Sequence, residues 1–159
     1  MSDARFPDAS LPDASFPDAS LPDASLPDAV PVVAAVVCRT GRYLLGRRPE
    51  HKRHGGLWEF PGGKMMEGES DLAAVDRELR EELGLRAVST GRVLWERRDP
   101  GSPFVIRFVE SEVRGDPTPT EHMEVGWFTP EALAVMPLAP TDAAFVARLG
   151  AEDGPLARP

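Results

Sequence analysis

One segment near the middle of the chain constrains the fold most, because it predicts a helix together with both of its ends. Between residues 71 and 83 the apolar residues recur at intervals of three and four, which puts them on one face of an α-helix: Leu72, Val75, Leu79 and Leu83. Ser70 stands where a serine side chain caps a first turn, and Gly84 where a left-handed cap favours glycine. The segment therefore predicts an amphipathic helix whose apolar face packs against a core.

The same helix carries three carboxylates on a neighbouring face. Glu78, Glu81 and Glu82 are related by three and four residues, so they cluster at the edge of the apolar stripe. Carboxylates at that spacing repel one another, and nearby arginines or a divalent cation must balance them. Oxygen ligands alone suit Mg²⁺ or Mn²⁺, and no group of thiols or histidines indicates zinc. For an isolated acidic triplet the alternative would be a solvated helix face.

These carboxylates belong to a longer array. Gly63 is followed after five residues by Glu69, and after seven more by the run Arg77-Glu78-Leu79-Arg80-Glu81-Glu82-Leu83-Gly84-Leu85. The array resembles the Nudix box, G-x5-E-x7-R-E-U-x-E-E-x-G-U with U aliphatic, at every fixed position. The flanks agree, because residues 57–64 are similar to the MutT-type entrance and residues 125–133 to a Trp-containing segment that follows in Nudix domains.

The resemblance implies an α+β fold, a Nudix-type α/β/α sandwich with a mixed β-sheet flanked by helices. It implies a Mg²⁺-dependent (or Mn²⁺-dependent) hydrolase that cleaves a pyrophosphate bond in a nucleoside diphosphate linked to another group. Nucleoside triphosphates, oxidised purine ones included, are the favoured substrates, with monophosphate and pyrophosphate as products. Dinucleoside polyphosphates of the Ap4A type and ADP-ribose are the alternative substrates. A nucleotide-binding regulator without turnover is the alternative function, disfavoured because every box carboxylate is present.

The resemblance also gives roles to individual residues. The expected metal ligands are Glu78, Glu82, Glu81 and the carbonyl of Gly62, and Glu81 and Glu82 count among the catalytic residues as well. Glu69 and Arg77 are expected to pair and hold the loop against the helix, with Gly63 and Gly84 as structural glycines. Lys64 and Arg48 are the candidate phosphate contacts, the latter with surface charge as an equal alternative.

The general base and the base-reading residue lie outside the box. Glu124 and Glu121 are the candidates for the general base, with Glu124 preferred. His122 between them is an alternative base, although a lone loop histidine is more simply a surface residue. Where MutT-type sequences have a base-reading Asn, this chain has Asp142, which when ionised suits a guanine-like edge with two N–H donors. The favoured alternative for Asp142 is an ordinary first-turn helix residue. Trp95 or Phe104 offers a ring on which an adenine stacks.

The remaining elements are predicted from alternation and breakers. Strands are expected at residues 32–38, 42–46, 57–60, 87–97, 104–110 and 124–128, the first two joined by a turn at Thr40 and Gly41. The run Pro61-Gly-Gly63 is expected to end the third strand. Short helices are expected from Pro130, and from Thr141 or Asp142 to Gly150. Cys38, in an apolar strand, is interpreted as a buried small hydrophobe.

The first 29 residues form a separate segment, in which a five-residue unit, (L/F)PDAS or LPDAV, recurs five times. A proline every fifth residue excludes a helix. We predict an arm over 1–29, a Nudix domain over 30–150 and a tail over 151–159. The favoured interpretation of the arm is a solvated segment; the alternative hypothesis is that its Leu and Phe side chains dock across a two-fold interface and make a homodimer.

Charge and composition exclude several classes of partner. Eighteen Lys and Arg against 26 Asp and Glu give a net charge of −8, a poor match for long nucleic acid or an anionic membrane. The one cysteine excludes an intrachain disulfide and suits a reducing compartment. The longest apolar run, residues 30–38, is too short to span a bilayer. We expect a cytoplasmic protein with a nucleotide as its small-molecule partner.

Overall fold

The computed structural model describes residues 29–151, so almost all of the predicted arm and most of the predicted tail lie outside the described residues. One mixed sheet organises this part of the chain around β1 (Val30–Arg39). On one side β1 pairs in parallel with β6 (Phe104–Arg114), which pairs antiparallel with β5 (Arg86–Arg98). On the other side β1 pairs antiparallel with β4 (Gly62–Lys64) and then with β2 (Arg42–Arg47).

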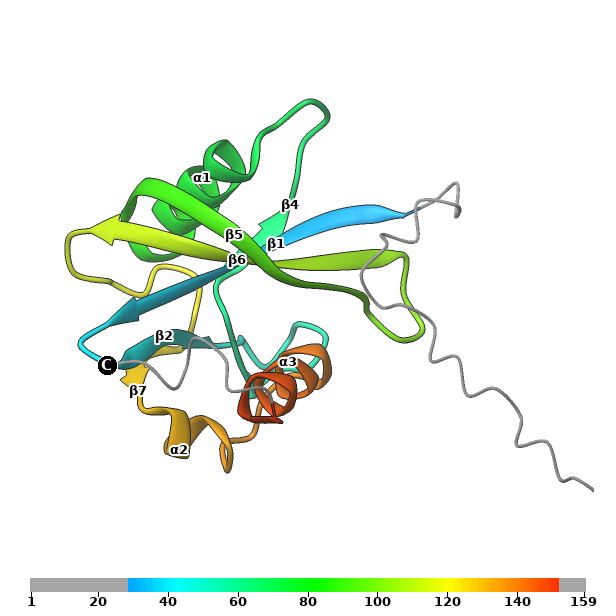
Figure 1. Cartoon of the computed structure of the whole chain (residues 1–159), viewed down its shortest axis with the longest axis vertical. Helices are drawn as coiled ribbons and strands as arrows, with labels where there is room; N and C mark the ends of the chain where they lie inside the picture. The colour runs from blue at the N-terminus through cyan, green and yellow to red at the C-terminus, as the bar shows by residue number, and fades with distance from the viewer. Residues whose placement is uncertain (1–28, 152–159) are drawn as a thin grey trace, which may run out of the picture.

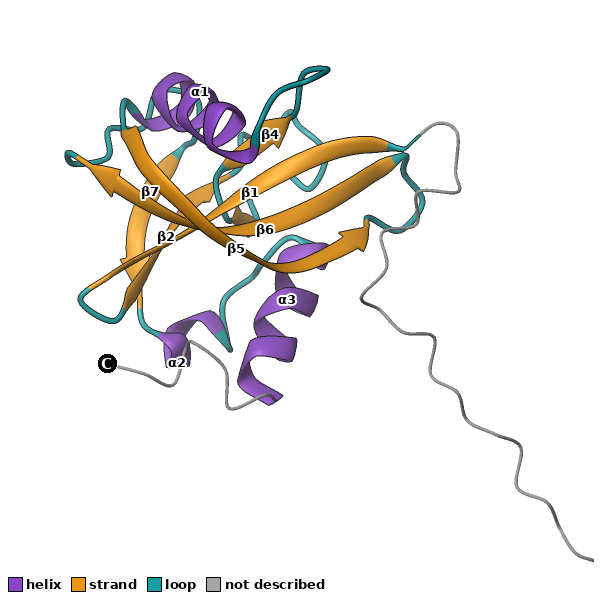
Figure 2. Cartoon of the chain, turned by 45° about the horizontal axis from the view of Figure 1, so that its top comes forward, coloured by secondary structure: helices purple, strands orange, loops and turns teal. Residues whose placement is uncertain are grey.

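Two more short strands extend the sheet from β2, which pairs antiparallel with β3 (Trp58–Glu59) and β7 (Glu124–Phe128). Helix α1 (Asp71–Leu83) covers one face, while α2 (Pro130–Leu133) and α3 (Pro140–Ala151) lie on the other (Figures 1 and 2). The predicted α+β sandwich with a mixed sheet between helices is therefore confirmed. Among residues 29–151 no helix is long and apolar enough to cross a membrane.

The core consists of two apolar clusters separated by β1. Val33, Ala35 and Val37 face α1, while Ala34 and Val36 face the side of α3, as the twofold alternation of a strand requires. Because both faces of β1 are buried, its sequence is a continuous apolar run rather than an alternating one.

The predicted helix forms with the predicted ends. The Ser70 hydroxyl accepts a hydrogen bond from the Ala73 N–H at 3.2 Å, and Gly84 adopts a left-handed φ of 66° while its N–H bonds to the Arg80 carbonyl. Val75 is fully buried, but Leu72 is 38% exposed. The interpretation of Leu72 as a core residue is wrong. It lies in the first turn of the helix, about one turn before Val75, where the fully buried part of the apolar face begins.

The glycines after Phe60 form a strand that the sequence did not indicate. Gly62 pairs with Ala34 and Gly63 with Val33, so β4 begins where a strand was expected to end. A Cβ at Gly62 would stand 1.8 Å from the Val33 carbonyl oxygen. Glycine at this position permits the close approach of two backbones. The third strand does end before Pro61, at Glu59, as predicted, but the glycines then begin a further strand.

Cys38 is exposed, so its interpretation as a buried hydrophobe is also wrong. It follows Val37, the last residue of β1 that pairs with β6, and therefore lies where β6 no longer flanks the strand. The turn beyond it is as predicted, because Thr40 and Gly41 both have positive φ angles, 51° and 74°, which a two-residue hairpin requires.

Candidate active site

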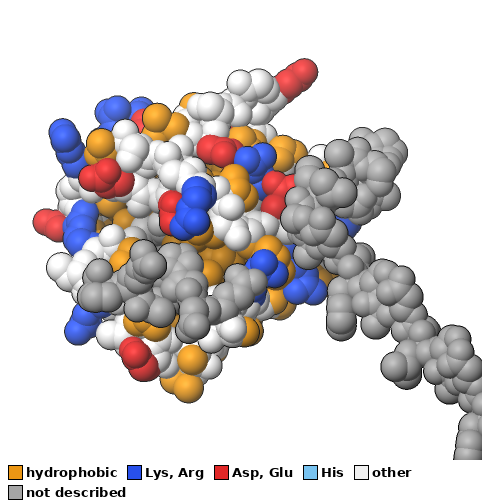
Figure 3. All heavy atoms as spheres, in the orientation of Figure 1, with side chains coloured by type: hydrophobic (Ala, Val, Ile, Leu, Met, Phe, Trp, Pro, Cys, Tyr) orange, Lys and Arg blue, Asp and Glu red, His pale blue; other side chains and the backbone are white. Residues whose placement is uncertain are grey.

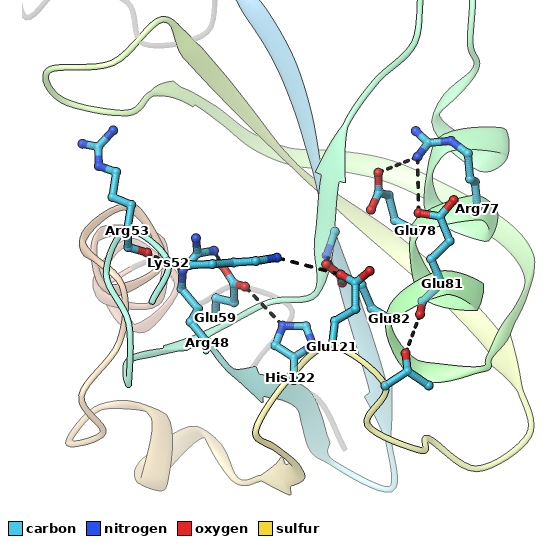
Figure 4. A network of polar contacts seen from close by, with 12 residues as sticks. Arg48, Lys52, Arg53, Glu59, Arg77, Glu78, Glu81, Glu82, Glu121 and His122 are labelled. Carbon is cyan, nitrogen blue, oxygen red and sulfur yellow. Dashed lines mark hydrogen bonds and ion pairs between the residues drawn. The ribbon is translucent and has the colours of Figure 1, made fainter. Parts of the chain in front are cut away.

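A cavity of about 430 Å³ opens beside the end of β3, the start of α3 and the acidic face of α1. Its size suits a nucleotide-sized ligand. Cationic side chains from the loop after β2 and from β4 line it: Arg48, Lys52, Arg53 and Lys64. Acidic side chains from five segments line it too: Glu59, Glu78, Glu82, Asp99, Glu121 and Asp142. Figure 4 shows most of these residues at close range.

Two of the three box carboxylates of α1 reach the cavity. Glu78 and Glu82 lie one turn apart and both line it, whereas Glu81 does not and its side chain is 55% exposed. The backbone carbonyl of Glu81 accepts a hydrogen bond from the Thr120 hydroxyl instead (Figure 4). The structure therefore brings Glu78 and Glu82 together and places Glu81 outside the lining.

Burial and mutual repulsion act on both lining carboxylates. Burial, followed by the negative charges of Glu59 and Glu78, raises the pKa of Glu82 to about 9, although the Gly62 N–H donates to its Oε2 at 3.1 Å. Burial also raises the pKa of Glu78, against the opposing effect of Arg77. A solvated acidic face would show neither shift, so these carboxyl groups form a buried acidic site in which ionisation is disfavoured.

Gly63 and Gly62 allow the backbone to approach these carboxylates. A Cβ at Gly63 would lie 2.4 Å from the Glu78 carboxyl carbon. The Glu78 side chain therefore occupies the space that any other residue at position 63 would fill. The Gly62 N–H donates a hydrogen bond to the Glu82 carboxylate, so the backbone of this glycine lies beside the site.

Arg77 ties the loop before α1 to the helix. Its Nε and Nη2 each donate to the Glu69 carboxylate at 2.9 Å, and Nη2 also donates to the Lys64 carbonyl at 2.8 Å. Through Nη1 it contacts Glu78 at 2.5 Å. The bidentate pair with Arg77 lowers the pKa of Glu69 to about 2. Arg77 thus positions both the loop and one carboxylate of the site.

The donor set suits a divalent cation. Within the part of the chain that the structure describes, no group of three or more acidic, histidine or cysteine side chains is already arranged to hold a metal ion. Glu78 is turned toward Arg77 and Glu82 toward the Gly62 N–H. Yet the lining carboxylates are oxygen donors of the type that Mg²⁺ and Mn²⁺ take, and a cation between them would offset the burial and the mutual repulsion that raise their pKa values.

The loop before β7 contributes Glu121 to the cavity and leaves Glu124 outside it. Glu121 lines the cavity and lies 4.0 Å from Lys52 (Figure 4), and its charge contributes to the raised pKa of both Glu78 and Glu82. Glu124 pairs with Arg47 at 3.1 Å, is 58% exposed and does not line the cavity. The geometry favours Glu121 as the general base, whereas the sequence favoured Glu124.

His122 is buried, so its interpretation as a surface histidine is wrong. Its Nε2 lies 3.2 Å from Glu59, whose other oxygen pairs with Arg48 at 2.5 Å (Figure 4). The ring packs on Gly46, where a Cβ would stand 2.5 Å from it. Glu59 is thereby held between two side chains in the lining of the cavity. The Arg48 guanidinium, the expected phosphate contact, is already paired with a carboxylate.

Aromatic residues line the cavity differently from what the sequence suggested. Phe104 lines it, and the Lys64 ammonium lies 5.0 Å from the centre of its ring. Trp95 does not, because its ring stacks on Phe108 and Phe145 in the core. Trp95 is therefore excluded as a stacking partner for a base, and Phe104 retains that possibility.

Asp142 is a buried cavity residue rather than an exposed residue of a first turn. It is 6% exposed, and its Oδ1 accepts a hydrogen bond from the Phe60 N–H at 2.8 Å. Burial, followed by the charge of Glu59, raises the pKa of Asp142 well above its usual range. A neutral carboxyl presents both a donor and an acceptor to a ligand.

Four of the acidic and basic residues of the cavity escaped the sequence analysis: Lys52, Arg53, Glu59 and Asp99. Glu59 lies in a strand between apolar neighbours, and alternation alone gives it no function. Lys52 and Arg53 belong to a basic loop that reads as surface charge. The only available signal was that this loop follows directly on Arg48, a candidate phosphate contact.

Comparison with known proteins agrees with this site. A family model described as the NUDIX domain matches residues 28–149. The CTP pyrophosphohydrolase of Escherichia coli is 37% identical over 115 residues, covering 71% of this chain and 85% of that protein. The 8-oxo-dGTP diphosphatase of Haemophilus influenzae is 33% identical over 123 residues, covering 74% and 89%.

Solved structures agree as well. The solution structure of the E. coli ORF135 protein superposes with a TM-score of 0.66 at 36% identity, covering 77% of this chain and 89% of that one. The MutT NUDIX hydrolase of Burkholderia pseudomallei superposes with a TM-score of 0.67 at 27% identity, covering 76% and 98%. The chain therefore belongs to the Nudix family, as a MutT-like hydrolase that acts on the pyrophosphate bonds of nucleotide substrates.

Proposed function

We propose that the protein hydrolyses nucleoside triphosphates to the monophosphate and pyrophosphate in the presence of Mg²⁺ or Mn²⁺. The observation that carries this is the division of the cavity into two chemically different ends. At the α1 end stand the carboxylates of Glu78 and Glu82 with Lys64 nearby, and at the α3 end stand Asp142 and Phe60. The first end suits a cation-bound phosphate chain, and the second suits a planar base.

The residues divide the chemistry between them. Divalent cations, when bound, neutralise phosphate charge and acidify the attacking water. Glu78 and Glu82 would hold them, and Arg77 orients Glu78. Glu121, which lines the cavity and is half exposed, accepts the proton of the water. Lys64 balances the charge of the phosphates.

The α3 end favours a cytosine-like base. A neutral Asp142 offers an O–H donor and a carbonyl acceptor, which match the ring nitrogen and the amino group of cytosine. An ionised Asp142 would match the two N–H donors of a guanine edge instead. The relative from E. coli is named for CTP, which supports cytidine triphosphates as first substrates.

Oxidised guanine nucleotides are the second candidate. The relative from H. influenzae is named for 8-oxo-dGTP, and it also covers most of this domain. An ionised Asp142 is the state that would accept such a base, so this substrate requires the raised pKa of Asp142 to fall when the ligand binds.

The test is turnover of a nucleotide panel with Mg²⁺: CTP, dCTP, dGTP, 8-oxo-dGTP, ADP-ribose and a dinucleoside tetraphosphate. We expect CMP and pyrophosphate from CTP as the preferred reaction. Preference for 8-oxo-dGTP would establish the second candidate. Preference for ADP-ribose, or no turnover at all, would contradict the proposal.

A further inference from the structure

A basic loop that follows β2 lines one side of the cavity. This loop, residues 48–56 and here called the strap, is held in shape by its own backbone, because the N–H groups of Gly55 and Gly56 bond to the carbonyls of Lys52 and Arg48 at 2.9 Å. The Arg48 Nε also donates to the Arg53 carbonyl at 2.7 Å. The strap is therefore a preformed loop that presents Lys52 and Arg53 to the cavity.

The tip of the strap is attached across the cavity to the turn between β5 and β6. The Arg53 Nη1 lies 3.3 Å from the Asp99 Oδ2, and its Nη2 donates to the Pro100 carbonyl at 3.2 Å. Arg53 and Asp99 both line the cavity. One guanidinium thus connects two loops that are 47 residues apart in the sequence.

Asp99 connects this contact to the base end. It is 7% exposed, and it accepts hydrogen bonds from the Thr141 hydroxyl at 2.7 Å and the Ser102 hydroxyl at 2.9 Å. Thr141 immediately precedes Asp142, the carboxyl proposed to face the base. The single carboxylate of Asp99 therefore joins the strap, the β5–β6 turn and the first turn of α3.

We propose that Arg53 and Asp99 form a latch that holds the strap closed over the base end, and that Asp99 is a positioning residue for nucleotide binding. This inference rests on the proposed function, since it takes the cavity to be the nucleotide site. A wall fixed before the ligand arrives lowers the entropy lost on binding, so the latch acts on affinity. Because the Arg53–Asp99 pair makes no contact with the α1 carboxylates, we expect its loss to leave the rate of the chemical step unchanged.

The first test measures the latch without measuring catalysis. Trypsin cleaves after Lys52 and Arg53 when the strap opens. With Asp99→Asn, an amide can keep a partner for the Thr141 hydroxyl while the charge opposite Arg53 is lost. We expect strap cleavage to accelerate two- to fivefold, the range set by about 1 kcal/mol, the upper end for a partly exposed ion pair.

The matched control is Arg86→Gln. It removes a surface ion pair of similar length, 3.2 Å to Asp76, whose residues do not line the cavity. Strap cleavage in this variant should equal that of the wild type. Equal cleavage rates in Asp99→Asn and Arg86→Gln would overturn the latch.

The second test is kinetic. Asp99→Asn and Arg53→Gln should each raise KM for the preferred nucleotide two- to fivefold with kcat within twofold, and the double variant should be no worse than the singles. The KM of Arg53→Lys should lie between that of the wild type and that of Arg53→Gln, because lysine keeps the positive charge. A fall in kcat with unchanged KM would overturn the positioning role. If the wild type turns over no nucleotide, the proposed function fails, while the trypsin comparison still decides the latch.

Discussion

Glu82 is the residue at which stability and function oppose each other most directly. Its carboxyl is 8% exposed and lies among other acids, which is why its pKa is raised to about 9. An ordinary unfolded carboxyl has a pKa near 4.5. Between these two values the folded state binds the extra proton, so stability falls as the pH rises through this window.

We predict that Glu82→Gln stabilises the protein in EDTA at pH 8 and lowers turnover by about 10²-fold or more. The amide oxygen keeps the hydrogen bond from Gly62, while the buried ionisable group is removed. The gain in thermal midpoint should be smaller at pH 5 than at pH 8. Scanning calorimetry and Mg²⁺-dependent pyrophosphate release are the measurements.

The control for this variant is Glu112→Gln, because Glu112 contacts Ser89 outside the cavity. It should change neither the midpoint nor the turnover appreciably. Unchanged turnover in Glu82→Gln would refute its assignment as a metal ligand, and a midpoint that falls at pH 8 would refute the electrostatic argument.

The choice of general base is the second matter at the residue scale. We predict that Glu121→Gln lowers kcat by roughly 10²- to 10⁴-fold, the usual contribution of a general base, because Glu121 lines the cavity. Glu124→Gln is its matched control, three residues away and outside the lining, and should retain kcat within twofold. Initial rates at saturating nucleotide and Mg²⁺ distinguish the two, and the reverse ranking would restore the preference drawn from the sequence.

At the scale of elements, the pair of Arg77 and Glu69 joins the loop after β4 to α1. Glu69 has its pKa lowered to about 2 by this pairing, from 4.5. Its contribution to stability is therefore complete above pH 4.5 and is lost as the pH falls toward 2, since the unfolded state then binds the proton more readily.

We predict that Glu69→Gln flattens the rise of stability with pH between about 2 and 4.5 and costs most above that window. Urea unfolding of the wild type and the variant at pH 3 and pH 6 measures this. The difference in unfolding free energy should be larger at pH 6. An equal difference at both values would show that the pair acts by packing alone.

The sequence predicted the elements well wherever the role of a residue depends only on its neighbours in the chain. Ser70 and Gly84 marked the ends of α1 because capping depends only on neighbouring backbone. The strand at Gly62 was missed because its cause is distant: the approach of Val33 is visible only once β1 and β4 lie side by side. The sequence alone does not distinguish the glycine that caps a helix, Gly84, from the glycine that lets two strands approach closely, Gly62.

The site, too, was predictable from the sequence only where its residues are placed by local helix spacing. The box fixed Glu78 and Glu82 through helix spacing, but Glu81 shares that spacing and still lies outside the cavity. His122, Asp99 and Arg53 became site residues only through contacts between loops. No period or motif encodes such contacts, because loop residues from separate segments meet only in the folded chain.

At the scale of the whole molecule, the two helical layers provide different ends of one cavity. The sheet lies between α1 and α3 (Figure 2), and the lining residues come from both sides of it. On the part of the face that is visible in Figure 3, basic and acidic side chains are interspersed.

The two apolar clusters and the cavity described above are built from residues 29–151. We therefore predict that a variant lacking residues 1–28 keeps the unfolding midpoint and the kcat/KM of the full chain. Calorimetry and nucleotide turnover measure this, and a loss of either would mean that the arm contributes to the fold or the site.

The homodimer hypothesis is tested by measuring the mass in solution of the same two proteins. Side chains that bury apolar surface between subunits cannot be removed without weakening the association. A dimeric full chain and a monomeric shortened one would therefore place the Leu and Phe repeats at the interface, whereas equal assembly states would dismiss that role.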